Sequence, residues 1–320
     1  MKVFATINET TAYINRQRAD GCSIGFVPTM GALHEGHLDL MRKAKNENDL
    51  LVVSVFVNPK QFNNPEDLKK YPRNLANDMK ALNSVGCDVL FAPETDEMYP
   101  ETENTNYDFG QLENVMEGAS RKGHFNGVAI VVRKLFEIVQ PHKAYFGEKD
   151  YQQLAIIKEL VKKENLAVEI VPCPIVREED GLAMSSRNER LTDEERTMAP
   201  FIYQTLKNVK NKVPQLSPEE LKTWVKKEFE QTGSFQLDYF EIADDTYLQP
   251  IQSWDNSTGT MGFIAVFLGK VSTIFAFLLW FWSLVKEEPA PHSVIFLLMI
   301  LYTLISFQCG DISINIQALH

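Results

Sequence analysis

SIGFVPTMGALHEGH, residues 23–37, joins a short run of β-forming residues to a glycine-containing turn with two histidines. Ser23–Thr29 predicts a strand, and the pattern after the turn predicts a helix over about His37–Asn46. Leu50–Val57 is apolar nearly throughout, which is typical of a strand covered on both faces. A strand, a helix and a second buried strand in this order predict a right-handed crossover within a parallel sheet.

The same alternation of apolar runs and helical patterns continues to about residue 176. Further helices are predicted at Leu75–Val85, Gly127–Val139 and Tyr151–Glu164, and further strands at Val89–Pro93, Lys143–Phe146 and Ala167–Val176. Strands that alternate with helices build a doubly wound parallel sheet with helices on both faces. We therefore expect residues 1–176 to form an α/β domain.

The pattern changes after Val176. Thr192-Asp-Glu-Glu195 has the form of a capping box and predicts a helix of about twenty residues. Ser217-Pro-Glu-Glu220 predicts a second helix, with proline at its first position. Short strands are predicted at Asp238–Ala243 and Gly262–Phe267. We expect residues 177–270 to form a smaller α+β domain.

Composition is that of a globular protein. The 320 residues include 32 Lys and Arg against 43 Asp and Glu, a formal net charge of −11. Such a chain has no general attraction for nucleic acid, although a local basic pocket for phosphate is compatible with it. The cysteines Cys22, Cys87, Cys173 and Cys309 form no CxxC or Cys/His pair, which argues against a disulfide scaffold or structural zinc. Because the N-terminal segment also lacks the apolar run of a signal peptide, we expect a cytoplasmic protein.

Residues 271–320 differ from the rest of the chain. They include 31 hydrophobic residues but only four charged ones, namely Lys286, Glu287, Glu288 and Asp311. The apolar runs Val271–Val285 and Val294–Phe307 have 15 and 14 residues. Each is shorter than the roughly 20 residues that cross a bilayer as a helix. We expect an atypical hydrophobic tail.

Three interpretations of this tail are open. A re-entrant or membrane-surface hairpin, anchored by Trp280 and Trp282, would associate the chain with a membrane. A non-native end, from a frameshift or a read-through junction, explains the abrupt change in composition without any new function, and we favour it. A buried extra element is the least favoured, because a compact protein has little room for so large an apolar surface.

Pro28–His37 contains the first candidate site. Its glycines and histidines lie where a strand ends and a helix begins, which is where parallel sheets bind ligands and helix N–H groups meet phosphate. His34 and His37 are three residues apart, so both rings can face one ligand and donate hydrogen bonds to developing charge. A solvated turn with incidental histidines is the alternative. A zinc site is weaker still, since metalloprotease histidines are four apart.

Three more polar clusters follow, at Gly147-Glu-Lys-Asp-Tyr-Gln-Gln153, Met184-Ser-Ser-Arg-Asn188 and Asn58-Pro-Lys-Gln-Phe62. Lys149 offers a point charge for phosphate, and Arg187 beside two serines offers a mobile phosphate clamp. Asn58 and Gln61 are amides suited to a hydroxyl-bearing carboxylate. Each cluster alone is explained equally by a charged helix start, a surface loop or an Asn-Pro turn. Together, the four clusters predict a nucleotide triphosphate site with an adjoining polar pocket.

Several common catalytic motifs are absent from the sequence. It has no GxSxG nucleophile turn, no GxxxxGK[ST] phosphate loop and no GxGxxG dinucleotide motif. Adenylyl transfer needs little covalent chemistry from the protein, only positioning and charge stabilisation. The four clusters offer these two things.

The chain resembles the pantoate–β-alanine ligase family from its N-terminus to about Lys270, through PTMGALHEGH, VSVFVNPKQF, YPRN, GHFNGVAIVVRKLF, FGEKDYQQL and REEDGLAMSSRN. The resemblance implies a Rossmann-like nucleotidyltransferase fold and two reaction steps. Pantoate's carboxylate attacks the α-phosphorus of ATP and releases pyrophosphate. The amine of β-alanine then attacks pantoyl adenylate, giving pantothenate and AMP. The resemblance also implies Mg²⁺ on the phosphates, a homodimer, and a second domain that closes over the site.

Site residues follow from the same resemblance. His37 takes the position usually described as the proton donor, with His34 and Lys149 as further catalytic residues; hydrogen bonding by the His37 imidazole alone is the alternative. The implied ATP-binding residues are Met30, Gly31, Ala32, Leu33, His34, Glu35, Gly36, His37, Gly147, Glu148, Lys149, Asp150, Val176, Met184, Ser185, Ser186 and Arg187. The implied substrate-binding residues are Gln61, Gln153, Asn58 and Tyr71. No residue is assigned as a metal ligand.

Two rival functions are open. Another nucleotidyltransferase of the same fold would adenylylate a phosphorylated acceptor. The amides of Gln61 and Gln153 argue against it, because such an acceptor would call for more Lys and Arg. The rival that is not an enzyme is a membrane-associated protein whose altered C-terminus has cost it activity.

Overall fold

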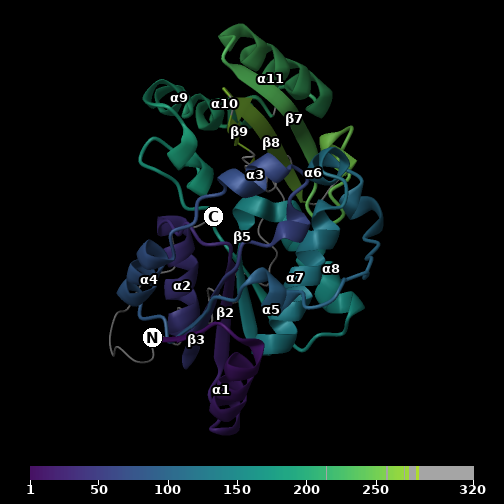
Figure 1. Cartoon of the computed structure of the whole chain (residues 1–320). Helices are drawn as coiled ribbons and strands as arrows, with labels where there is room; N and C mark the ends of the chain where they lie inside the picture. The colour runs from purple at the N-terminus through teal and green to yellow at the C-terminus, as the bar shows by residue number, and fades with distance from the viewer. Residues whose placement is uncertain (214, 257–258, 270, 274–278, 281–320) are drawn as a thin grey trace, which may run out of the picture. The chain divides into compact units, whose positions relative to one another are not determined.

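The computed structural model describes residues 1–213, 215–256, 259–269, 271–273 and 279–280 (Figure 1). The strands of its larger sheet are β1 (Lys2–Phe4), β2 (Ile24–Thr29), β3 (Leu50–Val55), β4 (Val89–Phe91), β5 (Lys143–Gly147) and β6 (Glu169–Cys173). They lie in the order β1-β4-β3-β2-β5-β6, and every neighbouring pair is parallel. The predicted parallel sheet is confirmed, with β1 as an additional edge strand.

Helices cover both faces of this sheet. The longer ones are α1 (Ile7–Ala19), α2 (Glu35–Glu47), α4 (Leu75–Ser84), α7 (His124–Val139) and α8 (Tyr151–Lys163). The short ones are α3 (Pro65–Lys70), α5 (Thr95–Met98) and α6 (Met116–Ser120), with single 3₁₀ turns η1 (Pro59–Gln61), η2 (Gly110–Glu113), η3 (Glu148–Asp150) and η4 (Ser186–Arg190). In Figure 1, α2 and α4 lie on one side of the strands and α7 and α8 on the other.

Alternate residues of the central strands pack into two different hydrophobic layers. Leu50 and Val52 of β3 pack with α7, whereas Leu51 and Val53 pack with α2 and α4. All four side chains are buried. Because successive side chains of a strand point to opposite faces, a strand covered on both faces reads as one apolar run. This explains the pattern of residues 50–57.

The order of connections creates a switch point in the sheet. From β2 the chain continues to β3 and β4 on one side, and it later returns to β5 on the other side of β2. The connections after β2 and β5 therefore diverge at the carboxyl ends of these neighbouring strands. Open α/β sheets bind ligands at such a point.

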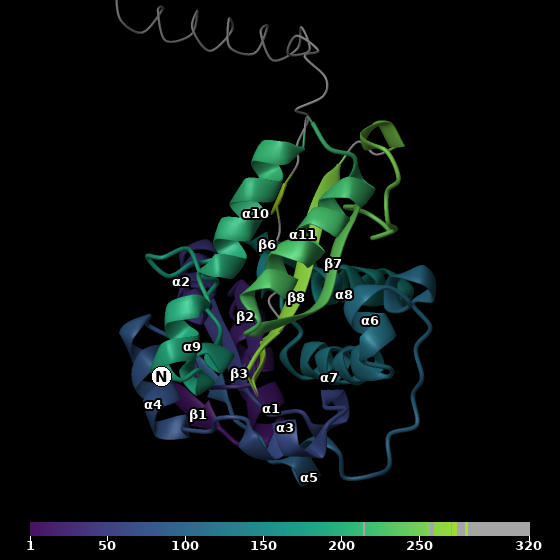
Figure 2. The same cartoon turned by 90° about the horizontal axis from the view of Figure 1, so that it is seen from above.

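The described residues beyond 176 form a second, antiparallel sheet with helices α9 (Asp193–Met198), α10 (Phe201–Lys212) and α11 (Pro218–Thr232). Strands β7 (Phe235–Asp244) and β8 (Thr260–Leu268) pair over their whole length. Figure 2 shows α10 and α11 beside these strands, and their apolar side chains share one hydrophobic cluster. The helix predicted after Thr192 is correct in its capping box, but it is two helices, α9 and α10. Pro200 separates them, because proline has no N–H to donate within a helix.

Two short strands extend this sheet beyond Lys270. β9 (Val271–Thr273) and β10 (Leu279–Trp280) both pair antiparallel with β8. The other residues of the expected hydrophobic tail, 274–278 and 281–320, lie outside the described residues, as does its second apolar run. Among the helices of the described part, none has the length and apolar character needed to span a membrane.

This pairing predicts the effect of shortening the chain. A chain that ends at residue 270 leaves one edge of β8 unpaired, and exposed strand edges favour aggregation. A chain that ends at residue 282 keeps β9 and β10. We expect the shorter form to have a lower midpoint of thermal unfolding, by about 2–4 °C for each kcal/mol lost in a domain of this size, and a smaller soluble fraction. Equal midpoints and solubility of the two forms would show that β9 and β10 add nothing to the fold.

Candidate active site

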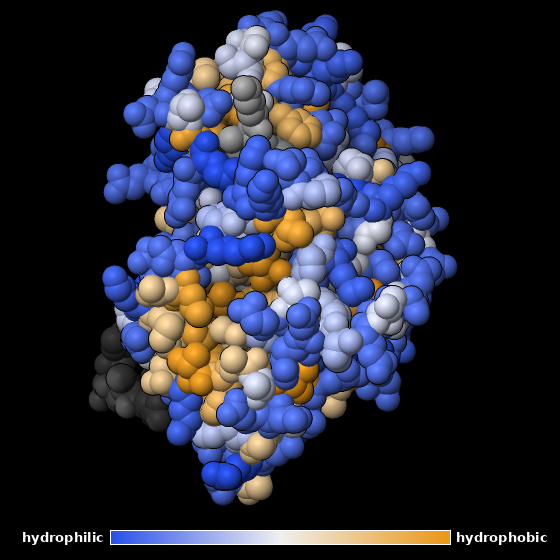
Figure 3. All heavy atoms as spheres, in the orientation of Figure 1, coloured by the Kyte–Doolittle hydropathy of each residue, from blue (hydrophilic) through white to orange (hydrophobic). Residues whose placement is uncertain are grey.

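A cavity lies at the switch point, where β2 and β5 end. The end of β2, the start of α2, the loop after β3, the apolar face of α7 and the segment after β6 all contribute to its wall. The lining residues with polar side chains include His34, His37, Gln61, Lys149 and Gln153. On the face drawn in Figure 3, apolar side chains gather in a patch from the centre to the lower left, with polar residues around it. The cavity thus combines an apolar wall with a few convergent polar groups, as binding sites commonly do.

The turn between β2 and α2 is held by a buried carboxylate. Gly31 and Ala32 both have positive φ, at 81° and 50°. The side chain of Asp78, from α4, accepts hydrogen bonds from the backbone N–H groups of Ala32 (3.2 Å) and Leu33 (2.8 Å). A side chain at position 31 would meet Asp78 Oδ2 at 2.9 Å from its Cβ. Asp78 therefore requires glycine here and fixes where α2 begins.

His34 and His37 lie against each other at the start of α2. Their ring centroids are 4.0 Å apart, and the backbone N–H of His34 donates a hydrogen bond to His37 Nδ1 (3.3 Å). A backbone N–H can only donate, so Nδ1 of His37 is the unprotonated nitrogen. The proton of the neutral ring is therefore on Nε2, which makes His37 a hydrogen-bond donor at that atom.

Both imidazoles are neutral near pH 7. Burial, followed by the nearby charge of Lys149, lowers the pKa of His34 from 6.5 to about 4. Burial, followed by the charges of His34 and Lys149, also lowers the pKa of His37 well below its ordinary value. An uncharged His37 can stabilise negative charge through its N–H, but it is a poor source of a proton in solution near neutrality.

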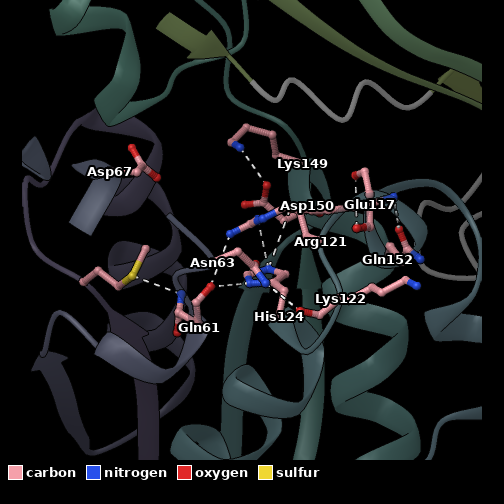
Figure 4. A network of polar contacts seen from close by, with 12 residues as sticks. Gln61, Asn63, Asp67, Glu117, Arg121, Lys122, His124, Lys149, Asp150 and Gln152 are labelled. Atoms are coloured by element: carbon pink, nitrogen blue, oxygen red, sulfur yellow. Dashed lines mark hydrogen bonds and ion pairs between the residues drawn. The ribbon is translucent and has the colours of Figure 1, made fainter. Parts of the chain in front are cut away.

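Lys149 supplies the cation of the cavity. Its ammonium group lies 2.8 Å from the carboxylate of Asp150, both in η3 after β5 (Figure 4). Burial raises the pKa of Asp150, but the charge and hydrogen bond of Lys149 outweigh it and lower this pKa overall. Asp150 is therefore ionised, and it holds the Lys149 ammonium beside the two histidines.

The Gln61 side chain is 9% exposed, and its Nε2 lies 3.1 Å from Met30 Sδ. Gln153, on the first turn of α8, and Tyr71, after α3, line the same cavity. Asn58 also lines it, but hydrogen bonds to Gln61 Oε1 and to the Gly127 carbonyl (both 3.1 Å) occupy its Nδ2.

A buried network holds the backbone of Gln61. Its carbonyl lies 2.8 Å from His124 Nδ1 and 3.3 Å from Arg121 Nη2 (Figure 4). Arg121 also contacts His124 Nε2 (3.1 Å) and the carboxylate of Glu117. Because arginine only donates, Nε2 of His124 is an acceptor and the ring is neutral with its proton on Nδ1. Gln152 accepts the backbone N–H of Glu117 (3.1 Å) and so ties α8 to this network.

Sequence reasoning assigned none of these supporting residues. His124 stands in GHFNGVAIVVRKLF, one of the segments that resemble the family, and the available signal is a histidine that opens an apolar helix face. Asp78 stands inside a predicted helix and had no such signal. Its role depends on α4 lying beside the turn, which only the folded chain shows.

Arg187 of the expected triphosphate clamp forms an ion pair with a carboxylate. Asp67 of α3 contacts Arg187 at 3.2 Å and Arg190 at 3.0 Å. Ser185 caps the following 3₁₀ turn by accepting the backbone N–H of Arg187 (3.3 Å), and Ser186 is buried. Nε of Arg187 is buried without a hydrogen-bond partner. The clamp segment is therefore ordered by Asp67, and one donor of Arg187 is left unused.

Most expected site residues line the cavity. They are Met30, His34, Gly36, His37, Asn58, Gln61, Tyr71, Gly147, Lys149, Asp150, Gln153, Val176 and Met184. Gly31, Ala32 and Leu33 form the turn behind it, and Glu148, Ser185, Ser186 and Arg187 are not part of its wall. Glu35 points elsewhere, since its half-exposed side chain pairs with Arg42. Within the described ranges, no three His, Cys, Asp or Glu side chains form a metal-binding group.

Comparison with known proteins identifies relatives of this chain. The family model described as pantoate-beta-alanine ligase matches residues 2–275. The pantothenate synthetase of Bacteroides fragilis is 49% identical over 274 residues, which cover 86% of this chain and 97% of that protein. The crystal structure of pantothenate synthetase from Thermus thermophilus superimposes with a TM-score of 0.81 at 42% identity, covering 88% of this chain and all of that one.

A second solved structure is that of a complex with ligands. The pantoate-beta-alanine ligase of Francisella tularensis, complexed with beta-gamma ATP and beta-alanine, superimposes with a TM-score of 0.73 at 38% identity. The superposition covers 87% of this chain and 97% of that one. With a family match over most of its length and close relatives along nearly their whole length, this chain belongs to the pantoate–β-alanine ligase family.

Proposed function

We propose that the cavity at the switch point performs the ATP-dependent condensation of pantoate with β-alanine, giving pantothenate, AMP and pyrophosphate. The observation that carries the residue assignment is that a neutral N–H donor, an ammonium group and two glutamine amides converge there, on His37, Lys149, Gln61 and Gln153. Membership of the family supports the reaction, and the ligands named for the Francisella tularensis protein support ATP and β-alanine as substrates.

In the first step a carboxylate oxygen of pantoate forms a bond to the α-phosphorus, and the bond from that phosphorus to the pyrophosphate oxygen breaks. Negative charge grows on the phosphates as pyrophosphate leaves. His37 Nε2–H and the Lys149 ammonium are donors suited to that charge. Because His37 is neutral, its role is hydrogen bonding and not proton donation.

In the second step the amine of β-alanine attacks the acyl carbon of pantoyl adenylate. An amide bond forms, the acyl–phosphate bond breaks, AMP leaves and the amine loses a proton. Gln61 and Gln153 hold the pantoyl group in both steps. Amides suit this task because they hydrogen-bond without exchanging a proton.

The cavity favours a carboxylate substrate over a phosphorylated acceptor. Among the described residues that line it, Lys149 is the cation, and no arginine is present. A second phosphate group would need further cations in the cavity wall, as forked Arg contacts usually supply. The alternative nucleotidyltransferase activity is therefore disfavoured.

Mg²⁺ is part of the proposal, as an ion that enters with the triphosphate. Mg²⁺ commonly keeps several waters and binds through substrate phosphates with one or two carboxylates. Asp150, a carboxylate in the wall, fits such a limited contribution. The ion would neutralise charge on the leaving pyrophosphate.

The second half of the chain completes the site in this proposal. Val176 and Met184, on either side of the expected domain boundary, line the cavity, and Arg187 follows closely. We infer that residues 177–270 act as the smaller domain that closes over ATP bound by residues 1–176. A homodimer in the cytoplasm is the expected setting.

Removing either donor should slow adenylate formation. We expect His37→Ala and Lys149→Ala each to lower the rate of pantoate-dependent pyrophosphate release by about 10² to 10³, the usual loss for one such donor. The midpoint of thermal unfolding should stay near that of the parent chain. Lys143→Ala, which removes a surface partner of Glu47, is the matched control and should keep full activity. Near-normal pyrophosphate release by both site variants would contradict the assignment.

Gln61 should be needed in both half-reactions. We expect Gln61→Ala to slow pyrophosphate release from ATP and pantoate, and also to slow pantothenate formation from supplied pantoyl adenylate and β-alanine. Lys149→Ala, which acts on the phosphates of ATP, should affect the second assay less. A Gln61→Ala enzyme that uses pantoyl adenylate as well as the parent does would restrict Gln61 to the first step.

The pH dependence separates a neutral donor from an acid. With the pKa of His34 lowered to about 4 and that of His37 lowered also, both rings stay neutral from about pH 6 to about 8. The rate of pyrophosphate release should therefore not fall as pH rises through 6.5. His37→Gln, which keeps an N–H donor but cannot titrate, should show the same profile at a lower rate. A rate that falls about tenfold per pH unit above 6.5 would identify an imidazolium acid.

A further inference from the structure

Backbone groups determine the orientation of the buried Asn58 amide. Asn58 is 1% exposed. Its Oδ1 accepts a hydrogen bond from the backbone N–H of Lys60 (3.2 Å), and its Nδ2 donates to the backbone carbonyl of Gly127 (3.1 Å). A backbone N–H can only donate and a backbone carbonyl can only accept. These two contacts therefore identify the oxygen end and the nitrogen end of this amide.

The orientation of Asn58 sets that of Gln61. Asn58 Nδ2 also donates to Gln61 Oε1, at 3.1 Å. With its oxygen used in this way, Gln61 turns its Nε2 toward the cavity, where the nearest partner is Met30 Sδ at 3.1 Å. A thioether is a weak acceptor, so a carboxylate or hydroxyl oxygen of a substrate is the stronger partner for this NH₂ group.

Tyr99 stands behind this pair, at the end of α5. Its hydroxyl donates to Asn58 Oδ1 at 2.8 Å, but its side chain is not part of the cavity wall. The ammonium groups of Lys60 and Lys134 lie 5.0 and 5.3 Å from its ring centroid. Burial, followed by the charge of Glu103, raises the pKa of the Tyr99 phenol, so the hydroxyl keeps its proton.

We propose that Tyr99 is a positioning residue for pantoate, which acts through Asn58 to hold the Gln61 amide with its NH₂ group toward the substrate. The inference rests on the proposed function, in which Gln61 contacts pantoate. Without the Tyr99 hydroxyl, Asn58 keeps only the long Lys60 contact at its oxygen and is freer to rotate. A reversed Gln61 would present its carbonyl to the pantoate carboxylate, and two acceptors would then face each other.

Tyr99→Phe tests this directly, because it removes the hydroxyl and keeps the ring near the two lysines. We expect the dissociation constant for pantoate, measured by calorimetry, to rise about three- to tenfold, the usual effect of one neutral hydrogen bond. The KM for ATP and the midpoint of thermal unfolding should not change. Tyr13→Phe is the matched control, since Tyr13 of α1 packs on Phe4 of β1 and does not line the cavity. Unchanged pantoate affinity in Tyr99→Phe would overturn the inference.

The same substitution in a Gln61→Ala background shows whether Tyr99 acts through Gln61. If it does, Tyr99→Phe has no further effect on pantoate binding there, because coupled residues are not additive. An equal loss in both backgrounds would overturn the role of Tyr99 and leave the proposed function intact. A Gln61→Ala chain that binds pantoate normally would instead remove the substrate assignment of Gln61, and with it this inference.

Discussion

The parallel pairing of β2 with both β3 and β5 is the constraint on which the site depends. Parallel strands need long crossover connections. The connection after β2 leads to β3 and the connection after β5 leads to β6, so the two leave the sheet in opposite directions. The gap between them receives the turn before α2 from one strand and η3 from the other. Lys149 is thereby brought beside His34 and His37, although more than a hundred residues separate it from them in the sequence.

The orientation of the polar side chains at the site is determined by groups that can only donate or only accept a hydrogen bond. The His34 N–H assigns the proton of His37, Arg121 assigns that of His124, and Lys60 and Gly127 assign the ends of Asn58. Two of these assignments reach the cavity as donors, at Nε2–H of His37 and, through Asn58, at Nε2 of Gln61, whereas His124 holds the backbone carbonyl of Gln61. A cavity that presents neutral donors and one ammonium group suits charge that develops on the phosphates as the pantoate carboxylate attacks.

Much of the fold could be predicted because buried positions are apolar and recur at a regular spacing in the sequence. The strand predicted at Leu50–Val57 and the helix predicted at about His37–Asn46 were found at Leu50–Val55 and Glu35–Glu47, since a strand covered on both faces and an amphipathic helix have distinct patterns. The capping boxes at Thr192 and Ser217 were also correct. The break at Pro200 was missed because the capping signal marks where a helix begins and says nothing of where it ends. β1 and α1 left weaker patterns and were not predicted.

The cavity-lining residues could be nominated because they cluster at strand ends, but their supports could not. Asp78, Glu117 and Tyr99 act across contacts that join distant segments, and each looks like an ordinary polar residue in its local sequence. Glu35 was expected to bind ATP because it lies inside the motif, but its half-exposed side chain pairs with Arg42 and does not face the cavity. Motifs locate a site, whereas the roles of individual side chains depend on the packing around them.

The central claim is that this cavity forms pantoyl adenylate before β-alanine reacts. Exchange of labelled pyrophosphate into ATP, measured without β-alanine, tests it most directly, because it requires a reversible adenylate step. The account predicts exchange that depends on pantoate and that is lost in His37→Ala. Exchange that proceeds without pantoate, or that appears only when β-alanine is added, would contradict it.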